Sequence, residues 1–339
     1  MKRFFILTAL AVLLGVSSAS AQQIAVVSED GTTTICQTLQ AAIESASDGC
    51  VIYLPGGGFP LPDSVKITKK LTIIGIGHKS DNDNVDGSTT ITGNLWFNEG
   101  SSGSAVMGCY ITGNVNIGEG EATVNNVLVK CCNLNSVCVY NATCQGTYIN
   151  QNYIRNTSYF SYSSAKITNN ILHSISNVHG GTISYNIILG YSSIKSGYIY
   201  YYYAIVANSS TILNNIIRIK THREDHTGTI YYYNILEGSD NHVNSNLSPC
   251  DFGDNPINVG DVDWNDVFEE WNGGAINPAS NFHFKESYKQ YESQVGVYAN
   301  GVDFDKQIAP VPYIVAKRIA DETDAAGQLK IQVRVKSGE

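Results

Sequence analysis

A short sequence tag recurs through the middle of the chain and restricts its fold more than any other feature. Each copy has one leading residue, then Asn, then one or two mostly aliphatic residues. The copies are Cys132-Asn133-Leu134, Gln151-Asn152-Tyr153-Ile154, Asn169-Asn170-Ile171-Leu172, Tyr185-Asn186-Ile187-Ile188, Asn214-Asn215-Ile216-Ile217, Tyr233-Asn234-Ile235-Leu236 and Ser245-Asn246-Leu247. The tag asparagines are 19, 18, 16, 29, 19 and 12 residues apart. These irregular steps suit the stacked coils of a parallel β-helix solenoid.

The start of the chain has the three regions of a secretory signal peptide. Lys2 and Arg3 form a basic start, an apolar run covers residues 4–16, and Ala19-Ser20-Ala21 is a small-residue cleavage motif. We therefore predict that residues 1–21 are removed near Ala21, and that the protein is secreted, periplasmic or attached to the cell surface. No later stretch reaches 18 apolar residues, so we expect no transmembrane anchor.

Length and charge restrict the partners of the mature chain. Removing 21 of 339 residues leaves 318, and losing Lys2 and Arg3 takes the formal net charge from -9 to -11. An acidic chain without a basic tract argues against nucleic acid as a partner. We expect one domain, with a capped β-helix over residues 22–249 and a C-terminal cap region over 250–339. In that region, residues 329–336 alternate apolar with polar and predict a half-buried strand at the far end.

The N-terminal part predicts a short helix followed by β segments. Residues 38–46 place four apolar side chains on one helical face, and Asp48-Gly49 ends the pattern. Strands are predicted over 50–54, 65–67 and 70–76, with a turn over 55–58.

From Leu39 to His78, the motifs Leu-Gln-Ala-Ala-Ile, Gly-Cys-Val-Ile-Tyr-Leu-Pro-Gly-Gly and Lys-Lys-Leu-Thr-Ile-Ile-Gly-Ile-Gly-His occur in order. This run resembles the opening of the pectate-lyase-like right-handed parallel β-helix superfamily. The resemblance covers about residues 35–247 and implies an all-β solenoid whose N-terminal helix caps the first coil, as an open end requires.

That superfamily contains lyases, hydrolases, isomerases, adhesins and inert spacers, so the resemblance does not define an activity. Hydrolases of the polygalacturonase type need paired carboxylates, and calcium-dependent pectate lyases need clustered carboxylates with a base. Residues 122–223 contain neither Asp nor Glu. We therefore expect neither mechanism in the central coils, and we expect no cofactor.

The longest step between tags, from Asn186 to Asn215, contains Tyr191, Tyr198 and the run Tyr200–Tyr203. An enlarged coil usually projects a loop, often on the binding face. The tyrosines that we predict to bind a ligand are Tyr198, Tyr200, Tyr201, Tyr202 and Tyr203, with Tyr231 and Tyr233 one coil later. The alternative is that these tyrosines pack down the solenoid as ordinary strand formers.

One basic segment offers weak catalytic candidates, namely Arg218, Lys220 and His222. If the segment is a strand, these alternate residues share a face. A β-elimination reaction can use Lys or His as the base, with a neighbouring cation that neutralises the carboxylate of the sugar. Arg218-Ile219-Lys220 also matches the substrate-binding Arg-Ile-Lys of polygalacturonases, but the aspartates of that family are missing. The alternative is a solvated strand that runs into a charged turn.

Metal and disulfide candidates are equally limited. Asp261 and Asp263 resemble a fragment of a calcium loop, although a solvated cap loop also explains them. Cys109 and Cys132 are expected to stack in successive coils within disulfide range, and Cys36 and Cys50 bracket the predicted helix. Buried free thiols are the alternative for all four.

Taken together, the residues favour an exported β-helix protein that binds, or presents itself to, glycans. One alternative is a metal-free polysaccharide lyase with a Lys, His and Tyr site. The other is a structural adhesin or spacer.

Overall fold

The computed structural model describes residues 23–78, 87–195, 198–202, 204–218, 230–232, 234–237, 257–260, 263–271, 276–278, 280–302, 304, 313–319, 328 and 331–336. The predicted signal peptide lies outside these residues.

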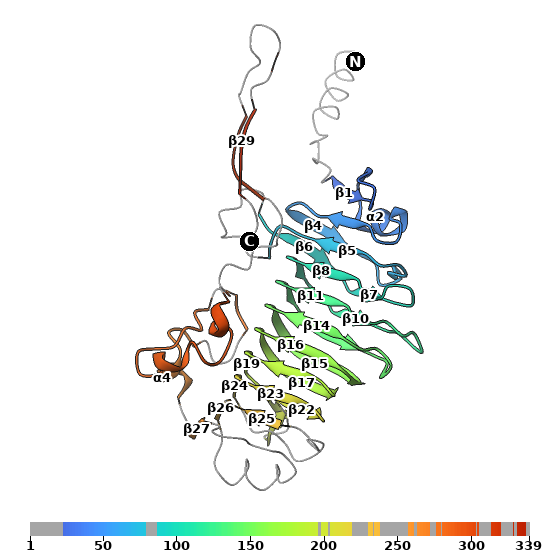
Figure 1. Cartoon of the computed structure of the whole chain (residues 1–339). Coiled ribbons are helices and arrows are strands. Elements are labelled where there is room, and N and C mark those ends of the chain that lie inside the picture. The colour runs from blue at the N-terminus through green and yellow to red at the C-terminus, as the bar shows by residue number, and fades with distance from the viewer. Residues whose placement is uncertain are drawn as a thin grey trace, which may run out of the picture.

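The protein is an all-β molecule built from two long, mainly parallel sheets (Figure 1). The first sheet has eleven strands in the order β2-β1-β3-β5-β8-β11-β14-β16-β18-β23-β25. Its strands are β1 (Ile24–Val27), β2 (Thr33–Cys36), β3 (Val51–Tyr53), β5 (Thr72–Ile74), β8 (Ala105–Met107), β11 (Leu128–Lys130), β14 (Thr147–Asn150), β16 (Ala165–Thr168), β18 (Thr182–Ser184), β23 (Thr211–Leu213) and β25 (Ile230–Tyr232). From β3 onward every pairing is parallel.

The second sheet has fourteen strands, and its main path runs β27-β26-β24-β19-β17-β15-β12-β9-β6-β4, with β7, β10, β13 and β22 beside it. Its strands are β4 (Gly57–Pro60), β6 (Thr89–Thr92), β7 (Leu95–Phe97), β9 (Tyr110–Ile111), β10 (Val115–Ile117), β12 (Asn133–Leu134), β13 (Val137–Val139), β15 (Tyr153–Ser163), β17 (Ile171–His179), β19 (Ile187–Ile188), β22 (Ile205–Asn208), β24 (Ile216–Ile217), β26 (Ile235–Glu237) and β27 (Ile257–Gly260). Between the two sheets, inward-facing aliphatic residues form one continuous core.

The tag is a corner of the chain at which it passes from the first sheet to the second. Its leading residue has a left-handed backbone, with φ values of 56°, 55°, 58° and 56° at Gln151, Asn169, Tyr185 and Asn214. This conformation is uncommon outside Gly and Asn. The next residue is a fully buried asparagine. We call Asn152, Asn170, Asn186, Asn215 and Asn234 the asparagine ladder.

Hydrogen bonds join each member of the asparagine ladder to its neighbours. The side-chain oxygen of Asn186 accepts from the backbone N–H of Asn170 at 2.9 Å, and that of Asn215 accepts from Asn186 at 2.9 Å. The amide of Asn186 also donates to the carbonyl of Ile167, on the preceding turn of chain, at 2.8 Å. The ladder therefore satisfies buried backbone groups that no strand pairs.

Asn133 does not belong to the asparagine ladder, so the grouping of the first tag was wrong by one residue. Asn133 pairs with Tyr153, and the ladder position is filled by Cys132, whose N–H donates to the side-chain oxygen of Asn152 at 2.9 Å. The Cys132 side chain is small enough to fit at a buried corner. The sequence pattern alone could not show whether Cys132 or Asn133 occupies the ladder position. The last copy, at Asn246, lies outside the described residues.

Cys109 and Cys132 stack in successive coils as expected, because Asn133 N–H bonds the carbonyl of Cys109 at 3.0 Å. Both carry free, buried thiols in this structure, and burial raises the pKa of Cys109 to about 12. Cys36 and Cys50 are also free thiols.

The other expected cysteine pair is kept apart by strand register. Cys36 pairs with Ile24 at the start of β1, whereas Val51, directly after Cys50, pairs with Val27 at its end. Cys50 lies one residue beyond that pair, so the two cysteines lie about 13 Å apart along the strand direction, on strands that flank β1, which is too far for a disulfide.

The predicted N-terminal helix is confirmed as α2 (Leu39–Ser45). The hydroxyl of Thr38 accepts from Ala41 N–H at 3.1 Å, and the helix buries Leu39, Ala42 and Ile43. The expected turn over 55–58 instead leads into β4, which begins at Gly57. The reason is tertiary, because β4 finds a parallel partner in β6.

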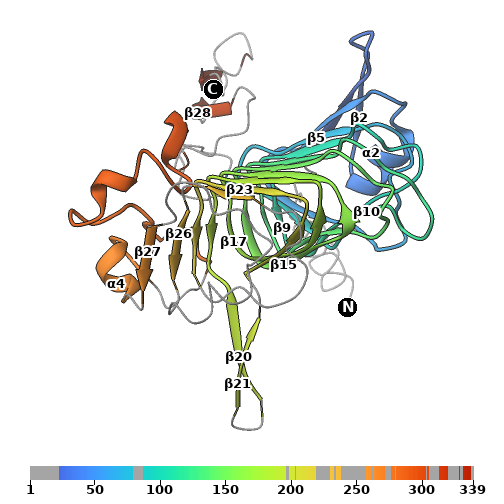
Figure 2. The ribbon, with the colours of Figure 1, turned by 60° about the horizontal axis from the view of Figure 1, so that its bottom comes forward.

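The enlarged coil projects as an antiparallel hairpin of β20 (Tyr191–Lys195) and β21 (Tyr198–Tyr202). Figure 2 shows this hairpin standing out from the stack of strands. The expectation that the longest step carries a projecting element is confirmed for its backbone. Tyr203 and Tyr233 lie outside the described residues.

The C-terminal region lies against the outer face of the second sheet. It contains α4 (Trp264–Val267) and the short 3-10 helices η1 (Lys289–Tyr291) and η2 (Ala299–Gly301). The predicted tail strand forms as β29 (Ile331–Lys336), but it pairs only with β28 (Tyr313–Ile319), in a separate two-stranded sheet. It therefore does not extend either long sheet.

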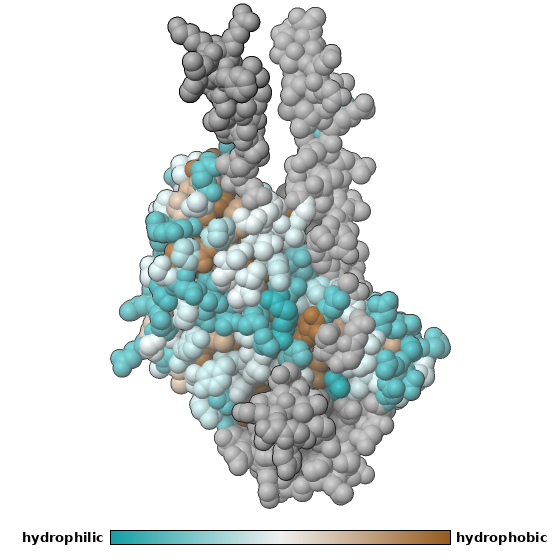
Figure 3. All heavy atoms as spheres, turned by 180° about the vertical axis from the view of Figure 1, so that it is seen from behind, coloured by the Kyte–Doolittle hydropathy of each residue, from teal (hydrophilic) through white to brown (hydrophobic). Residues whose placement is uncertain are grey.

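The surface of the described residues is mainly hydrophilic or neutral in the view from behind, with small hydrophobic areas (Figure 3). Among the described residues, no helix has the length and apolar character needed to cross a membrane.

Candidate functional site

The outer face of the second sheet gathers polar and aromatic side chains from successive coils. Strand register aligns Tyr110, Asn133, Tyr153 and Ile171 as one outward column. Ile187 and Ile216 continue this column towards the far end of the stack. The column therefore changes from polar to apolar along the sheet.

The polar end of this face is organised by Arg155. Its guanidinium lies 5.0 Å from the ring centre of Tyr110 and donates to the side-chain oxygen of Asn133 at 2.7 Å. A second donor reaches the carbonyl of Ile111 at 3.1 Å. A guanidinium held by a ring and two acceptors is fixed in orientation, which suits a structural cation at least as well as a ligand contact.

The apolar end is covered by the C-terminal region. Tyr153, Ile171, Ile187, Leu189 and Ile216 form a second hydrophobic core with residues of that region. The contributing residues are Trp264, Val267, Phe268, Phe282, Phe284, Val295, Val297 and Phe304. The carbonyl of Asn214 also accepts from Gly296 N–H at 2.9 Å, and its amide donates to Gln294 O at 2.8 Å. The region is thus packed on the sheet rather than tethered beside it.

At the edge of this cover, His173 and Arg218 share a second outward column. His173 directly follows Leu172, and Arg218 directly follows Ile217. Leu172 and Ile217 both pair with Ile188 of β19, so His173 and Arg218 lie two strands apart. Burial lowers the pKa of His173, a hydrogen bond with Gly190 O at 3.0 Å opposes this, and the positive charge of Arg218 lowers the pKa further. His173 is therefore neutral at pH 7.

Trp271 of the C-terminal region completes this corner. The guanidinium of Arg218 lies 4.9 Å from its ring centre. A neutral imidazole and a fixed cation two strands apart are the side-chain types that proton abstraction next to a carboxylate uses. The same arrangement also serves as a polar border around the second hydrophobic core.

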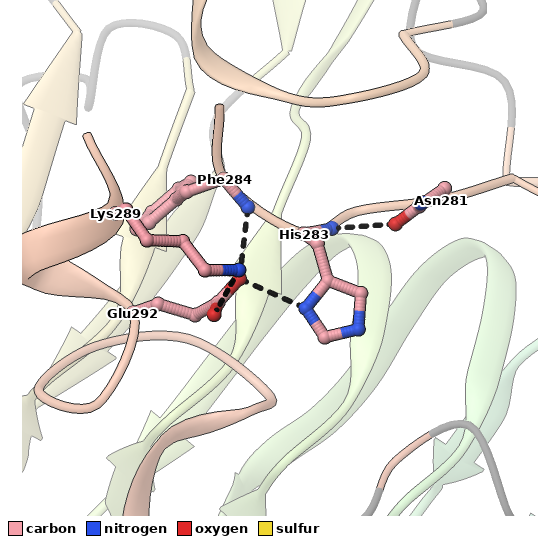
Figure 4. A network of polar contacts seen from close by, with 5 residues as sticks. All are labelled: Asn281, His283, Phe284, Lys289 and Glu292. Atoms are coloured by element: carbon pink, nitrogen blue, oxygen red, sulfur yellow. Dashed lines mark hydrogen bonds and ion pairs between the residues drawn. The ribbon is translucent and has the colours of Figure 1, made fainter. Parts of the chain in front are cut away.

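A second histidine is held within the C-terminal region itself (Figure 4). Nδ1 of His283 lies 2.8 Å from Oε1 of Glu292, and the other carboxylate oxygen is 2.6 Å from the Lys289 ammonium. The N–H of Phe284 also donates to Oε1 at 2.9 Å. The His283 ring stacks on Tyr298 with ring centres 3.8 Å apart. This network fixes η1 to the segment that precedes it.

The charged network predicts a pH dependence. Burial pushes the pKa of Glu292 upward, but the Lys289 ammonium, Phe284 N–H and His283 outweigh it, so the pKa is lowered from 4.5. A lowered folded-state pKa stabilises the fold above the unfolded value, and that stabilisation is lost as pH falls through the folded value. We expect thermal unfolding of the C-terminal region, followed by tryptophan fluorescence, to move to lower temperature as pH drops below about 4.5.

The Glu292→Gln variant should lack this acid-induced change and unfold at lower temperature than the wild type near neutral pH. Glu286→Gln removes an exposed carboxylate from the same segment and should retain the wild-type profile. Identical pH profiles for all three proteins would show that the network does not stabilise the region.

The structure describes only some of the residues that the sequence singled out. Arg218 is partly buried and contacts Trp271, whereas Lys220, His222 and Asp261 lie outside the described residues. The backbone of Tyr198, Tyr200, Tyr201 and Tyr202 forms β21, and Tyr231 lies in β25.

Asp263 has a structural role, since its carboxylate caps α4 by accepting from Asn265 N–H at 2.9 Å. Among the residues described, no group of three or more His, Cys, Asp or Glu side chains is placed to hold a metal ion.

Sequence reasoning missed His173, Trp271, His283 and Glu292. His173 directly follows a tag, in Ile171-Leu172-His173, and the equivalent residue after another tag is Arg218. A search for polar residues directly after each tag would have found His173 and Arg218. Nothing in the local sequence signals that His283 and Glu292 meet.

Comparison of the chain with family models, curated proteins and solved structures found no match.

Proposed function

We propose that this is an exported right-handed parallel β-helix protein, of pectate-lyase-like architecture, that binds glycans through the β20–β21 hairpin. The two long parallel sheets, the N-terminal helix and the asparagine ladder support this architecture. The signal-peptide motif supports export. The observation that carries the functional proposal is the projecting hairpin.

Tyrosine occupies five of the ten strand positions in the hairpin, namely 191, 198, 200, 201 and 202. Tyr191 pairs with Tyr202, and Tyr198 and Tyr200 follow at alternate positions on the same strand, so four tyrosines fall on one face of the ribbon. An isolated two-stranded hairpin adds little stability to a domain. Its residues are therefore better explained by contact with a partner than by packing.

Glycans fit this composition. A pyranose ring presents C–H groups on its faces and hydroxyl groups at its edge. A tyrosine offers an apolar ring for the faces and a phenolic hydroxyl for hydrogen bonds. The chain is acidic overall, which disfavours polyanions as ligands.

The test is affinity gel electrophoresis of the mature protein against a panel of neutral and uronic-acid polysaccharides. The Tyr200–Tyr203 to Ala variant should bind at least about tenfold more weakly, a loss of about 1.4 kcal/mol. Changing Ser192 of β20 to Ala alters the facing strand at a position that pairs with Tyr201, outside the face of four tyrosines, and should leave binding unchanged. Unaltered binding by the tyrosine variant would reject the hairpin as the site.

A metal-free polysaccharide lyase is the second candidate, and the observation in its favour is that neutral His173 shares an outward column with Arg218. The same panel, followed by ultraviolet absorbance of unsaturated uronate products, separates the two. Product formed by the wild type but not by His173→Asn would favour the lyase. If no unsaturated product forms from any uronic-acid polymer, the glycan-binding function is favoured over the lyase. The absence of both binding and turnover would favour a structural adhesin or spacer.

A further inference from the structure

A strip of aromatic side chains lies on the outer face of β7, β10, β13 and β15, away from every residue considered so far. Register aligns Trp96 with Asn116, Asn116 with Cys138, and Cys138 with Tyr159. The flanking residues of β7, β10 and β13 are buried: Leu95, Phe97, Val115, Ile117, Val137 and Val139. The column that begins at Trp96 therefore faces outward. We call Trp96, Tyr140, Tyr159 and Tyr162 the aromatic strip.

Two rings of the aromatic strip, those of Trp96 and Tyr140, are held in place. Trp96 and Tyr140 stack with centres 5.9 Å apart and planes 15° apart. The Tyr140 hydroxyl donates to the side-chain oxygen of Asn116 at 3.3 Å, which spans the coil between the two rings. The ammonium of Lys66 lies 3.6 Å from the centre of the Trp96 ring. Such pre-ordering lowers the entropy cost of binding.

The three tyrosines of the aromatic strip are also exposed. Tyr140, Tyr159 and Tyr162 are 46%, 39% and 48% exposed, and they make up three of the five exposed large hydrophobic residues among those described. Three exposed aromatic residues within 23 positions of the chain, from Tyr140 to Tyr162, form a concentration rather than scattered exposure.

Backbone strain helps to keep Tyr162 at the surface. Ser161 and Tyr162 have φ values of 43° and 64°, and β15 shifts register between Tyr159 and Ser163. A bulky residue in this conformation is strained, and a bulge of this kind redirects a side chain. Backbone strain without gain in burial indicates a role for the exposed ring.

The strip carries no unbalanced charge. Lys66 is paired with Glu119 at 3.0 Å, and the other polar groups of the column and the strip are the Asn116 amide, the Cys138 thiol and the tyrosine hydroxyls. Flat apolar faces bordered by neutral hydrogen-bonding groups match an uncharged pyranose chain better than a polyanion.

The strip also leads towards the proposed hairpin site. Tyr159 pairs with Ser176 of β17, and the neighbouring Ile175 pairs with Ile205 at the start of β22. That strand begins three residues after Tyr202 ends the hairpin. A polymer lying along the strip, across successive coils, therefore runs towards the base of the hairpin.

We infer that the aromatic strip is a second contact surface for a neutral polysaccharide, which lies along the stack and reaches the hairpin. This inference rests on the proposed glycan-binding function but involves different residues.

The decisive variant combines Tyr140→Ala and Tyr159→Ala, which remove exposed rings and so preserve the core. The matched control is Tyr53→Ala, because Tyr53 is also 39% exposed but lies in β3 of the other sheet. With neutral polysaccharides on affinity gels, the double variant should bind about tenfold more weakly than the wild type. The Tyr53 variant should bind like the wild type.

A second measurement reads the strip directly. The chain has three tryptophans, so changing Trp264 and Trp271 to Phe leaves Trp96 as the sole reporter. Titration with a neutral oligosaccharide should change its fluorescence, and the change should be lost in the Tyr140→Ala background.

The outcomes separate the two proposals. Binding that is lost with the hairpin tyrosines but kept by the strip variant overturns the strip and leaves the hairpin standing. Binding that is lost in the strip variant but kept by the hairpin variant overturns the hairpin as the site and leaves the strip standing. Retention only on charged polymers, or on a protein ligand, overturns the strip as a surface for neutral polysaccharide.

Discussion

Replacing Asn186 by Leu should lower the free energy of unfolding by about 4 kcal/mol, since two or more buried groups each lose about 1–3 kcal/mol. Asn186 is fully buried. Its side-chain oxygen accepts from both the backbone N–H and the side-chain amide of Asn170. Its own side-chain amide donates to Ile167 O and Ser184 O. Leu fills a similar volume but makes none of these bonds. The backbone N–H of Asn170 then loses its acceptor, whereas the Asn170 amide keeps Ile149 O and Thr168 O, and Ser184 O keeps Asn169 N–H. The midpoint of urea unfolding measures the loss.

The matched control for this prediction is Asn156→Ala. Asn156 is exposed and ends a separate outer row of asparagines, in which its amide donates to Asn135. Because water replaces the lost bond, we expect less than about 1 kcal/mol of destabilisation. Equal losses in the two variants would mean that the asparagine ladder stabilises the stack no more than a surface contact does.

Replacing Phe268 by Ala should release the C-terminal region from the second sheet. Phe268 is fully buried and lies at the centre of an aromatic cluster. Its ring centre is 5.5 Å from those of Trp264 and Phe284, 5.6 Å from Phe282 and 5.8 Å from Trp271. Phe-to-Ala changes in a core cost about 3–5 kcal/mol. Since the main core is separate, that loss should be local.

Limited proteolysis with mass spectrometry tests the locality of this effect. Cleavage within residues 264–304 should accelerate in Phe268→Ala, while the coils before residue 190 stay protected. Glu269→Ala changes the exposed neighbour and should be cut at the wild-type rate. Equal acceleration throughout the chain would show that the two cores unfold together.

The sequence predicted the repeating architecture because the tag combines two local requirements. A left-handed corner favours residues such as Asn169 and Asn214, and the following buried position favours an amide that bonds to neighbouring coils. Both requirements leave a residue preference at each repeat. The same logic failed at Asn133, because Cys132 fills the ladder position without an amide.

The candidate site was less accessible to sequence reasoning. Arg218 was found as part of a charged run, but its neighbours His173 and Trp271 come from distant segments that only tertiary packing brings together. The C-terminal region has no repeat, and its aromatic residues meet through loops. The strip was missed because strand register aligns Trp96 with Tyr159 through Asn116 and Cys138, and Tyr140 reaches Trp96 by ring stacking, which spacing alone does not show.

The asparagine ladder also has a consequence for how this protein can change over evolution. The same hydrogen bond joins Asn170 to Asn186 across 16 residues and Asn186 to Asn215 across 29. Coil length is therefore free to vary as long as each corner is kept. An insertion after Leu189, where the present hairpin begins, adds a new surface without altering the stack. The position is a natural point for diversification, and for grafting foreign loops onto the scaffold.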